Sequence, residues 1–315
     1  MELFPNVYQI QSIFGGRNLF QYLFVGDKVV LVDSGIAETP GKVIFPYMDR
    51  LKISPQRLTL AVTTHPDVDH QGGNDAIKRF APAAWLSCGE ADRAMVEDPQ
   101  TLFECRYNYM LKEHEVGLDL EFLPLAGKKR RMDVTFSGGE TIGLADDWSL
   151  DVLHVPGHSH GHLALYDRKH KAVYASDALH GRGCPKADGS MGIPVTYYYV
   201  DVYLSTLRYF ESLDLDVFYS GHFPAMHGEE ITNFISESRQ TVELFDRVIL
   251  RELGHHPEGL KLEQLIETVA NAVGDWPRDT WVLAMFPVKG HLDRLEQQGK
   301  VRPLAGAQPG KWQLA

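Results

Sequence analysis

Short apolar runs alternate with stretches of helical spacing in the first third of the chain, and glycine-containing or polar turns separate them. This pattern predicts strands and helices in alternation, as in an α/β protein. The strands are expected at residues 19–24, 28–33 and 58–64, and the helices at residues 41–51 and 74–80.

The middle of the chain, residues 90–147, is irregular, with helical spacing only at residues 91–96 and 102–115. An insertion of this kind often forms a lid or a pocket wall beside an active site, and its position leads us to expect that role. Apolar runs then return and a charged helix follows. The later elements are expected at residues 150–155, 163–166, 172–176 and 216–220 as strands, and at residues 229–254 as a helix.

After a Gly/His/Pro break at residues 254–257 the pattern changes. Two amphipathic helices and a short strand pair are predicted there, at residues 262–273, 282–298, 301–303 and 311–314. We therefore expect a catalytic domain over residues 1–256 and a small helical module over residues 257–315.

The composition is that of an ordinary globular protein, with 44% apolar and 23% charged residues. No run approaches the roughly 20 apolar residues that a membrane span needs. The N-terminus lacks a basic segment followed by an apolar core, so we expect no export signal and a cytoplasmic location. Cys88, Cys105 and Cys184 are odd in number and widely spaced, and we expect them to be reduced.

The formal net charge of −11 disfavours a nucleic-acid partner, because such a partner requires clustered positive charge. The one dense basic run, residues 128–131, is interpreted as a solvated loop. We expect a small-molecule substrate and no membrane partner, and the sequence leaves a homodimer open.

Four side chains that can bind a metal ion lie within six residues, directly after a predicted strand. They are His65, Asp67, Asp69 and His70. Pro66 favours extended geometry at the residue before it, so the strand should run out into a loop here. A loop can direct several donors to one centre, whereas a strand would point them alternately to opposite faces.

Three further donors, His158, Asp177 and His222, each follow an apolar run and stand next to a small residue. A single histidine or aspartate at such a place is more often a turn or surface residue. The recurrence of the pattern in four segments argues against that interpretation. Because neighbouring strands can end along one rim of a sheet, we predict that all seven donors meet at a metal site.

Residues 64–74 resemble the His-x-His-x-Asp-His signature of the metallo-β-lactamase superfamily, and residues 30–35 resemble the strand and Asp-x-Gly turn near its N-terminus. Three later segments resemble its second histidine motif, bridging aspartate and last histidine, at residues 156–162, 175–178 and 220–222. The resemblance implies an αββα sandwich, with two sheets packed face to face and helices outside.

The resemblance also implies two divalent metal ions. One would be bound by His65, Asp67 and His158, the other by Asp69, His70 and His222, with Asp177 bridging both. Asp67 departs from the signature, which has its second histidine at this position. A carboxylate there favours iron or manganese relative to zinc, so the sequence leaves the metal open among these three.

Two close metal ions suit hydrolysis, because a bridging hydroxide forms near neutral pH and a metal polarises the carbonyl group. Asp69 is expected to orient the attacking hydroxide in addition to binding metal. His180 is a further candidate pocket group. His160 and His162 are expected to pack around the ligands rather than to bind metal.

A tyrosine near the centre would be able to donate a proton to a leaving oxygen. The candidates lie between the last two ligand motifs and are Tyr197, Tyr198 and Tyr199. Related lactonases carry a tyrosine in a similar place, while aromatic packing in a pocket wall is the alternative for each of the three.

The C-terminal module resembles the winged-helix-type tail of some family members, and we interpret it as a structural lid rather than a DNA reader. The first functional hypothesis is a hydrolase of lactones, thioesters or carboxyl esters. A phosphodiesterase or ribonuclease of the same fold is the second, although the charge disfavours it. Asp67 keeps open non-hydrolytic iron chemistry such as sulfur oxidation. A ligand-binding protein without turnover is a further alternative, against which the complete donor set argues.

Overall fold

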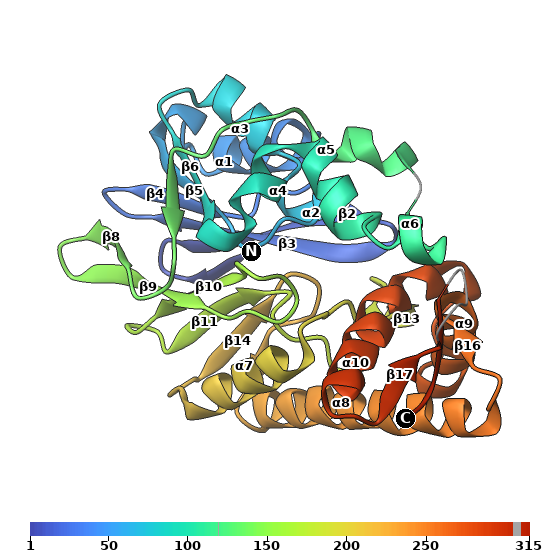
Figure 1. The fold of residues 1–315 in the computed structure, drawn as a ribbon. Coiled ribbons are helices and arrows are strands. Elements are labelled where there is room, and N and C mark those ends of the chain that lie inside the picture. Colours follow the sequence, from blue (N-terminus) through green and yellow to red (C-terminus); the bar gives the residue numbers. More distant parts are fainter. Residues whose placement is uncertain (119, 305–309) are drawn as a thin grey trace.

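In the computed structural model, which describes residues 1–118, 120–304 and 310–315, two β-sheets lie face to face (Figure 1). The strands of the first sheet, in spatial order, are β1 (Glu2–Phe4), β2 (Val7–Phe14), β3 (Arg17–Val25), β4 (Val29–Val32), β5 (Leu58–Thr63), β6 (Trp85–Gly89) and β7 (Val134–Phe136). Those of the second are β15 (Met226–His227), β14 (Val217–Ser220), β11 (Ala172–Ser176), β10 (Leu163–Asp167), β9 (Trp148–His154) and β8 (Thr141–Ala145).

Alternate side chains of the central strands enter two different apolar layers. In β4, Val30 and Val32 pack between the sheets, whereas Leu31 packs on the outer face. Strands β4, β5 and β6 pair in parallel. Because parallel strands are buried on both faces, they appear in the sequence as continuous apolar runs. The strands predicted at residues 28–33 and 58–64 are confirmed to within a residue at each start.

Helices cover the outer face of each sheet, so the predicted αββα sandwich is confirmed. Helices α1 (Phe45–Arg50) and α3 (Asn74–Phe80) cover the first sheet through Met48 and Ile77. Helices α7 (Val200–Ser212) and α8 (Glu229–His255) cover the second through Phe210 and Phe234. The π-helix η1 (Pro40–Ile44) precedes α1, and the 3-10 turn η2 (Pro55–Arg57) precedes β5. Helix α7 was not predicted.

The part of this insertion that precedes β7, from Glu90 to Ala126, contains a series of short helices instead of the two predicted segments. They are η3 (Glu90–Asp92), α4 (Arg93–Glu97), α5 (Pro99–Leu102), η4 (Phe103–Tyr107), α6 (Leu111–His114) and η5 (Leu120–Ala126). The break between α4 and α5 falls at Asp98, whose backbone is extended. The Asp98 side chain caps α5 by accepting a hydrogen bond from Gln100 N. This series packs on the same apolar cluster as the C-terminal helices.

The C-terminal part contains β16 (Leu260–Lys261), α9 (Leu262–Val273), η6 (Arg278–Ala284), α10 (Met285–Gln297), β17 (Val301–Pro303) and β18 (Lys311–Leu314). The three strands form a sheet in the order β16–β18–β17. Leu265 of α9 and Leu292 of α10 belong to the same buried apolar cluster as Phe245 of α8. The winged-helix description and the division after residue 256 stay predictions.

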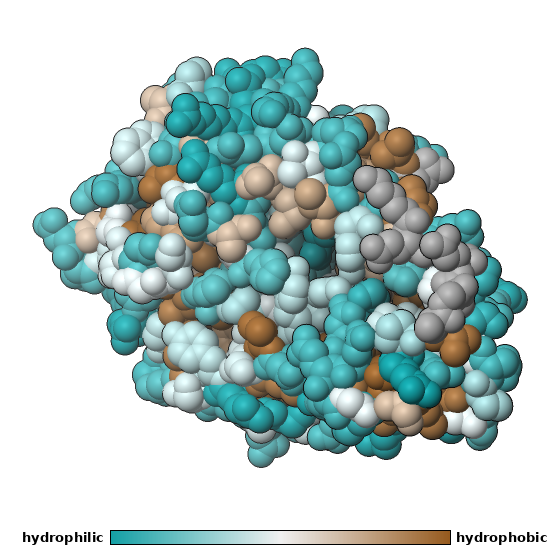
Figure 2. Space-filling model, viewed as in Figure 1, coloured by the Kyte–Doolittle hydropathy of each residue, from teal (hydrophilic) through white to brown (hydrophobic). Residues whose placement is uncertain are grey.

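The face of the molecule in Figure 2 is mostly hydrophilic, with hydrophobic side chains in small groups. Over the described residues, every helix is too short or too polar to cross a lipid bilayer.

Candidate metal centre

Every predicted donor lies just beyond the end of a strand. Strand β5 ends at Thr63, and the next residues lead into the short helix α2 (Val68–Gln71), which carries two of the donors. Strands β11 and β14 are parallel neighbours, so Asp177 and His222, which follow them, lie at one edge of the second sheet. His158 lies in the loop after β9.

Four of the donors form one tight cluster. The Nε2 atom of His222 lies 3.2 Å from Asp177 Oδ2, 3.5 Å from Asp69 Oδ2 and 3.3 Å from His70 Nε2. His70 Nε2 lies 3.7 Å from Asp177 Oδ2 and 3.9 Å from Asp69 Oδ2. Two imidazoles and two carboxylates at this spacing suit a divalent transition metal. The donors at this position therefore fit a metal ion.

Hydrogen bonds on the far side of each ring direct the Nε2 atoms inward. His70 Nδ1 donates to Asp33 Oδ2 at 2.9 Å, and His222 Nδ1 donates to the carbonyl oxygen of Asn18 at 2.6 Å. A ring that donates from Nδ1 in its neutral form keeps a lone pair on Nε2. Both rings thus present the lone pair that a metal needs, in the arrangement of a metal-bound histidine.

Asp33 joins the strand ends that meet at the centre. Its carboxylate accepts from Thr64 N at 2.8 Å and from the hydroxyls of Thr64 and Ser176 at 2.9 and 2.8 Å, in addition to His70. The Thr64 hydroxyl, which donates to this carboxylate, lies 3.0 Å from His65 Nδ1 and accepts a hydrogen bond from it. His65 is therefore also left with its Nε2 lone pair.

Two buried polar atoms of the centre have no hydrogen-bond partner within the described chain: His65 Nε2 and Asp177 Oδ1. An unsatisfied buried polar atom costs about 1–3 kcal/mol, so these two atoms are suited to binding a cation. Burial, and then the neighbouring His70, hold the pKa of His65 well below its usual value, and its ring is neutral.

Carboxylates make the centre favourable for positive charge. Burial by itself lowers the pKa of His70, yet Asp177, Asp69 and Asp33 raise that pKa to about 10. Burial likewise opposes ionisation of Asp177, but the charges of His222 and His70 hold its pKa well below the usual range. Both shifts express the same preference for a cation among these side chains.

Asp67 lies in a different environment from the other donors. Its carboxylate pairs with the buried Arg106, which donates from Nε to Oδ1 and from Nη2 to Oδ2, the latter at 2.9 Å. The Tyr107 hydroxyl donates to Oδ1 at 2.8 Å, and His158 Nε2 lies 2.8 Å from Oδ2. Burial raises the pKa of Asp67, but the Arg106 charge outweighs it and holds the pKa well below the usual range.

Two further histidines, His162 and His180, lie next to the cluster. His162 stacks on His65 with ring centroids 4.7 Å apart, and its Nε2 pairs with the carbonyl oxygen of Ala175 at 3.2 Å. His180 Nε2 pairs with the Thr196 hydroxyl at 3.0 Å, and burial lowers its pKa to about 3. Possible ligand atoms of His162, His65 and His158 lie within 4.8 Å of one another, and so do those of His180, His158 and Asp177.

A cavity of about 400 Å³ opens beside the cluster. Asp69, Asp177 and His222 face it, together with Arg17, whose Nη2 lies 3.8 Å from Asp69 Oδ2. Most of the remaining wall is apolar and comes from the β2–β3 hairpin, the insertion, β13 (Met191–Ile193) and the C-terminal part. It includes Phe14, Leu118, Phe122, Ile193, Val282, Leu283 and Phe286. The insertion thus forms part of the pocket wall, as expected from its position.

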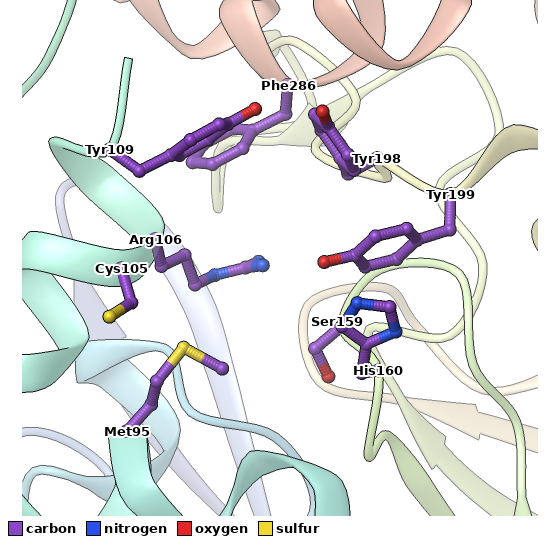
Figure 3. A pocket seen from close by; sticks show the side chains of 9 residues that line it. All are labelled: Met95, Cys105, Arg106, Tyr109, Ser159, His160, Tyr198, Tyr199 and Phe286. Atoms are coloured by element: carbon purple, nitrogen blue, oxygen red, sulfur yellow. The ribbon is translucent and has the colours of Figure 1, made fainter. Parts of the chain in front are cut away.

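Arg106 lines a second cavity, of about 220 Å³ (Figure 3), whereas its partner Asp67 lines the first. Arg106 and Tyr199 point toward one another across the second cavity, and Phe286 lines both cavities. The Arg106–Asp67 pair therefore stands between the second cavity and the metal cluster.

The three candidate tyrosines do not line the cavity beside the cluster. The Tyr197 hydroxyl pairs with His291 Nε2 at 2.9 Å in the core, and the Tyr198 hydroxyl donates to Asp293 at 2.5 Å. Tyr199 packs on His160, with ring centroids 3.8 Å apart, in the second cavity. Their positions agree with aromatic packing, and a proton-donating role for one of them stays a prediction.

Arg106, Tyr107 and Arg17 were not foreseen from the sequence. Asp33 was noted only as part of a turn. A carboxylate in place of a signature histidine is a signal that a cation stands nearby, but the sequence does not say which of the chain's arginines or lysines it is.

Comparisons with known proteins agree with this geometry. Residues 15–222 match the family model of the metallo-beta-lactamase superfamily. Acyl-coenzyme A thioesterase MBLAC2 of Gallus gallus is 28% identical over 202 residues, which cover 58% of this chain and 64% of that protein. The hydroxyacylglutathione hydrolase of Aeromonas salmonicida is 28% identical over 142 residues, 44% of this chain and 40% of that protein.

The chain thus spans less than two thirds of the length of these relatives. Among solved structures, a metallo-beta-lactamase family protein from Thermus thermophilus superposes with a TM-score of 0.78 at 19% identity, covering 99% of this chain and all of that one. A beta-lactamase domain protein from Burkholderia ambifaria gives 0.75 at 14% identity, covering 100% and 93%. These likenesses show the fold, and the family match covers well over half of the sequence. The chain belongs to the metallo-beta-lactamase superfamily.

Proposed function

We propose that this protein is a metal-dependent hydrolase of thioesters. The observation that carries the proposal is the cluster of Asp69, His70, Asp177 and His222 at the edge of a largely apolar cavity of about 400 Å³. The names of the relatives, an acyl-coenzyme A thioesterase and a hydroxyacylglutathione hydrolase, support an acyl substrate.

A divalent metal bound by these donors supplies Lewis acidity toward a carbonyl oxygen and toward water. The residues of the chain supply the remaining parts. Asp69 faces the cavity, and its carboxylate can accept a proton from an attacking water molecule. Arg17, within 4 Å of that carboxylate, adds positive charge where an oxyanion would develop.

The cavity wall favours an acyl chain over a phosphodiester. Phe14, Phe122 and Phe286 offer apolar surface against which a hydrocarbon chain can pack, and its burial contributes roughly 25 cal/mol per Å². Arg17 is the one arginine or lysine among the described residues that line this cavity. The same wall carries four carboxylates, those of Asp67, Asp69, Asp177 and Asp279. A polyanionic strand would be repelled by them and by the net charge of −11 on the chain.

The test is a substrate panel with protein loaded separately with zinc, iron(II) or manganese(II). We expect kcat/KM to be highest for acyl thioesters, compared with lactones, carboxyl esters and phosphodiesters. Asp177→Asn removes one charge from the cluster and should abolish most of the turnover. Asp167→Asn, a buried aspartate that pairs with His170 outside the centre, should not. Turnover of phosphodiesters alone, or of no substrate at all, would contradict the proposal.

A further inference from the structure

The Asp67 carboxylate has no free position for a metal ion. Oδ1 accepts from Arg106 Nε and from the Tyr107 hydroxyl. Oδ2 accepts from Arg106 Nη2 and lies 2.8 Å from His158 Nε2. A carboxylate oxygen has two lone pairs, so four partners fill the acceptor capacity of the whole group.

His158 is committed to the same ion pair. His158 Nε2, the atom that a metal would need, lies 2.8 Å from Asp67 Oδ2 and 3.1 Å from Arg106 Nη2, so it is already in contact with both members of the pair. Arg106 Nη1 also donates to the carbonyl oxygen of His158 at 3.0 Å, which fixes the backbone of that loop. The family resemblance assigns three donors to this metal ion, and only His65 among them keeps a donor atom, Nε2, without a partner.

Arg106 is built into this place. Its side chain is 7% exposed, and its guanidinium carbon lies 5.1 Å from the centre of the Phe286 ring. If a metal ion displaced it, a buried guanidinium would lose its carboxylate partner, which is strongly unfavourable. If a metal ion bound beside it, two cations would stand within a few ångströms in a site shielded from water.

The cluster of Asp69, His70, Asp177 and His222 has donor atoms available for a metal ion, and no arginine in the described part of the chain is hydrogen-bonded to its carboxylates. His70 and His222 pair through Nδ1 with groups outside the cluster, which leaves both Nε2 atoms directed into it, and Asp177 Oδ1 has no partner within the described residues. The nearest guanidinium there, that of Arg17, lies 3.8 Å from Asp69 Oδ2 and makes no hydrogen bond to it.

We infer that this chain holds one metal ion, at Asp69, His70, Asp177 and His222, and that the Arg106 guanidinium takes the place of the second. This inference rests on the proposed metal-dependent function. Arg106 then acts as a positioning residue: it holds Asp67 and His158 in place and supplies a fixed positive charge where the resemblance predicts a metal ion.

The test counts metal ions on the folded, full-length chain. Protein stripped with a chelator is reloaded with Zn²⁺, and bound ions per chain are measured by native mass spectrometry and by elemental analysis. We expect one ion on the wild type. Arg106→Met, which frees Asp67 and His158, should bind two. Arg130→Met, which removes the Arg130–Asp75 ion pair outside the centre, should still bind one.

The double variant Asp67→Asn/Arg106→Met keeps the test decisive if Arg106→Met alone does not fold, because it leaves no unpaired buried charge. We expect it to bind one ion with the dissociation constant of the wild type. Two tightly bound ions on the wild type would overturn the inference, as would a folded Arg106→Met with one ion or a double variant that binds none. No bound ion on the wild type would refute the proposed function itself.

Discussion

Asp33 is not a proposed metal ligand, but it accepts a hydrogen bond from His70 Nδ1. A substitution of Asp33 therefore tests how that hydrogen bond orients His70 for metal binding. In Asp33→Asn the amide oxygen must stay at Oδ1, where it accepts from the backbone N–H of Thr64. The amide NH2 then replaces Oδ2, which accepts from His70 Nδ1 at 2.9 Å and from the Ser176 hydroxyl at 2.8 Å. Two donors would face each other at His70.

The imidazole can relieve this clash by moving its proton from Nδ1 to Nε2, which removes the lone pair that points to the cluster. Loss of such a partner typically weakens metal binding by about 10- to 100-fold. This corresponds to roughly 1.4–2.8 kcal/mol. We therefore expect the dissociation constant for Zn²⁺ to rise by this factor, measured by competition with a chromophoric chelator.

Asp167→Asn is the matched control, because Asp167 is also buried and pairs with a histidine Nδ1, that of His170 at 2.7 Å. It should lower the thermal midpoint of the metal-free protein and leave the zinc dissociation constant unchanged. If Asp33→Asn bound zinc as tightly as the wild type, the argument from ring tautomers would be wrong. Equal weakening by both variants would show that loss of stability, rather than the His70 proton, controls binding.

Two further predictions concern the packing of the centre and the response to pH. Gly221→Ala would place a Cβ atom 2.5 Å from Asp177 Oδ1, so we expect weaker zinc binding in the same competition assay, whereas Gly143→Ala, which meets open space, should have no effect. Burial lowers the pKa of His291, so the unfolded state binds the proton more tightly and stability should fall as pH drops below about 6.5. In urea titrations between pH 6.5 and 5.5, His291→Gln should reduce this slope by up to about 1.4 kcal/mol per pH unit, and an unchanged slope would show that His291 is not the group that titrates.

The sandwich could be predicted because its strands carry their own signal. Residues 28–33 and 58–64 are continuous apolar runs, since parallel strands between two helical layers are buried on both faces. The meeting of the donors also followed from local order, since each stands one or a few residues beyond such a run. These features depend on neighbours in the sequence, which is why a pattern reveals them.

The partners of the donors could not be predicted in this way. Arg106 lies 39 residues from Asp67 in a stretch of short helices without a clear period, and Asp33 lies 37 residues from His70. Contacts at this separation depend on how the insertion folds over the sheet edge. The tyrosines at residues 197–199 illustrate the same limit: proximity to the ligand motifs along the chain did not bring them into the cavity beside the cluster.

Asp67 and Arg106 have to be considered together, because neither is stable at its place alone. A carboxylate at position 67 without Arg106 would add a third anion beside Asp69 and Asp177 in a buried site, and a buried Arg106 without Asp67 would be an unpaired cation. The exchange of a histidine for an aspartate therefore does not simply harden a metal site, as the residue alone suggests. Where the signature has a neutral histidine ligand, this chain has Asp67, which forms an ion pair with Arg106. Arg106, a side chain of the insertion, then carries the positive charge that a metal ion would have brought. Any relative that keeps an aspartate here should, by this reasoning, either supply its own buried cation or bind its first metal ion in the position that Arg106 fills.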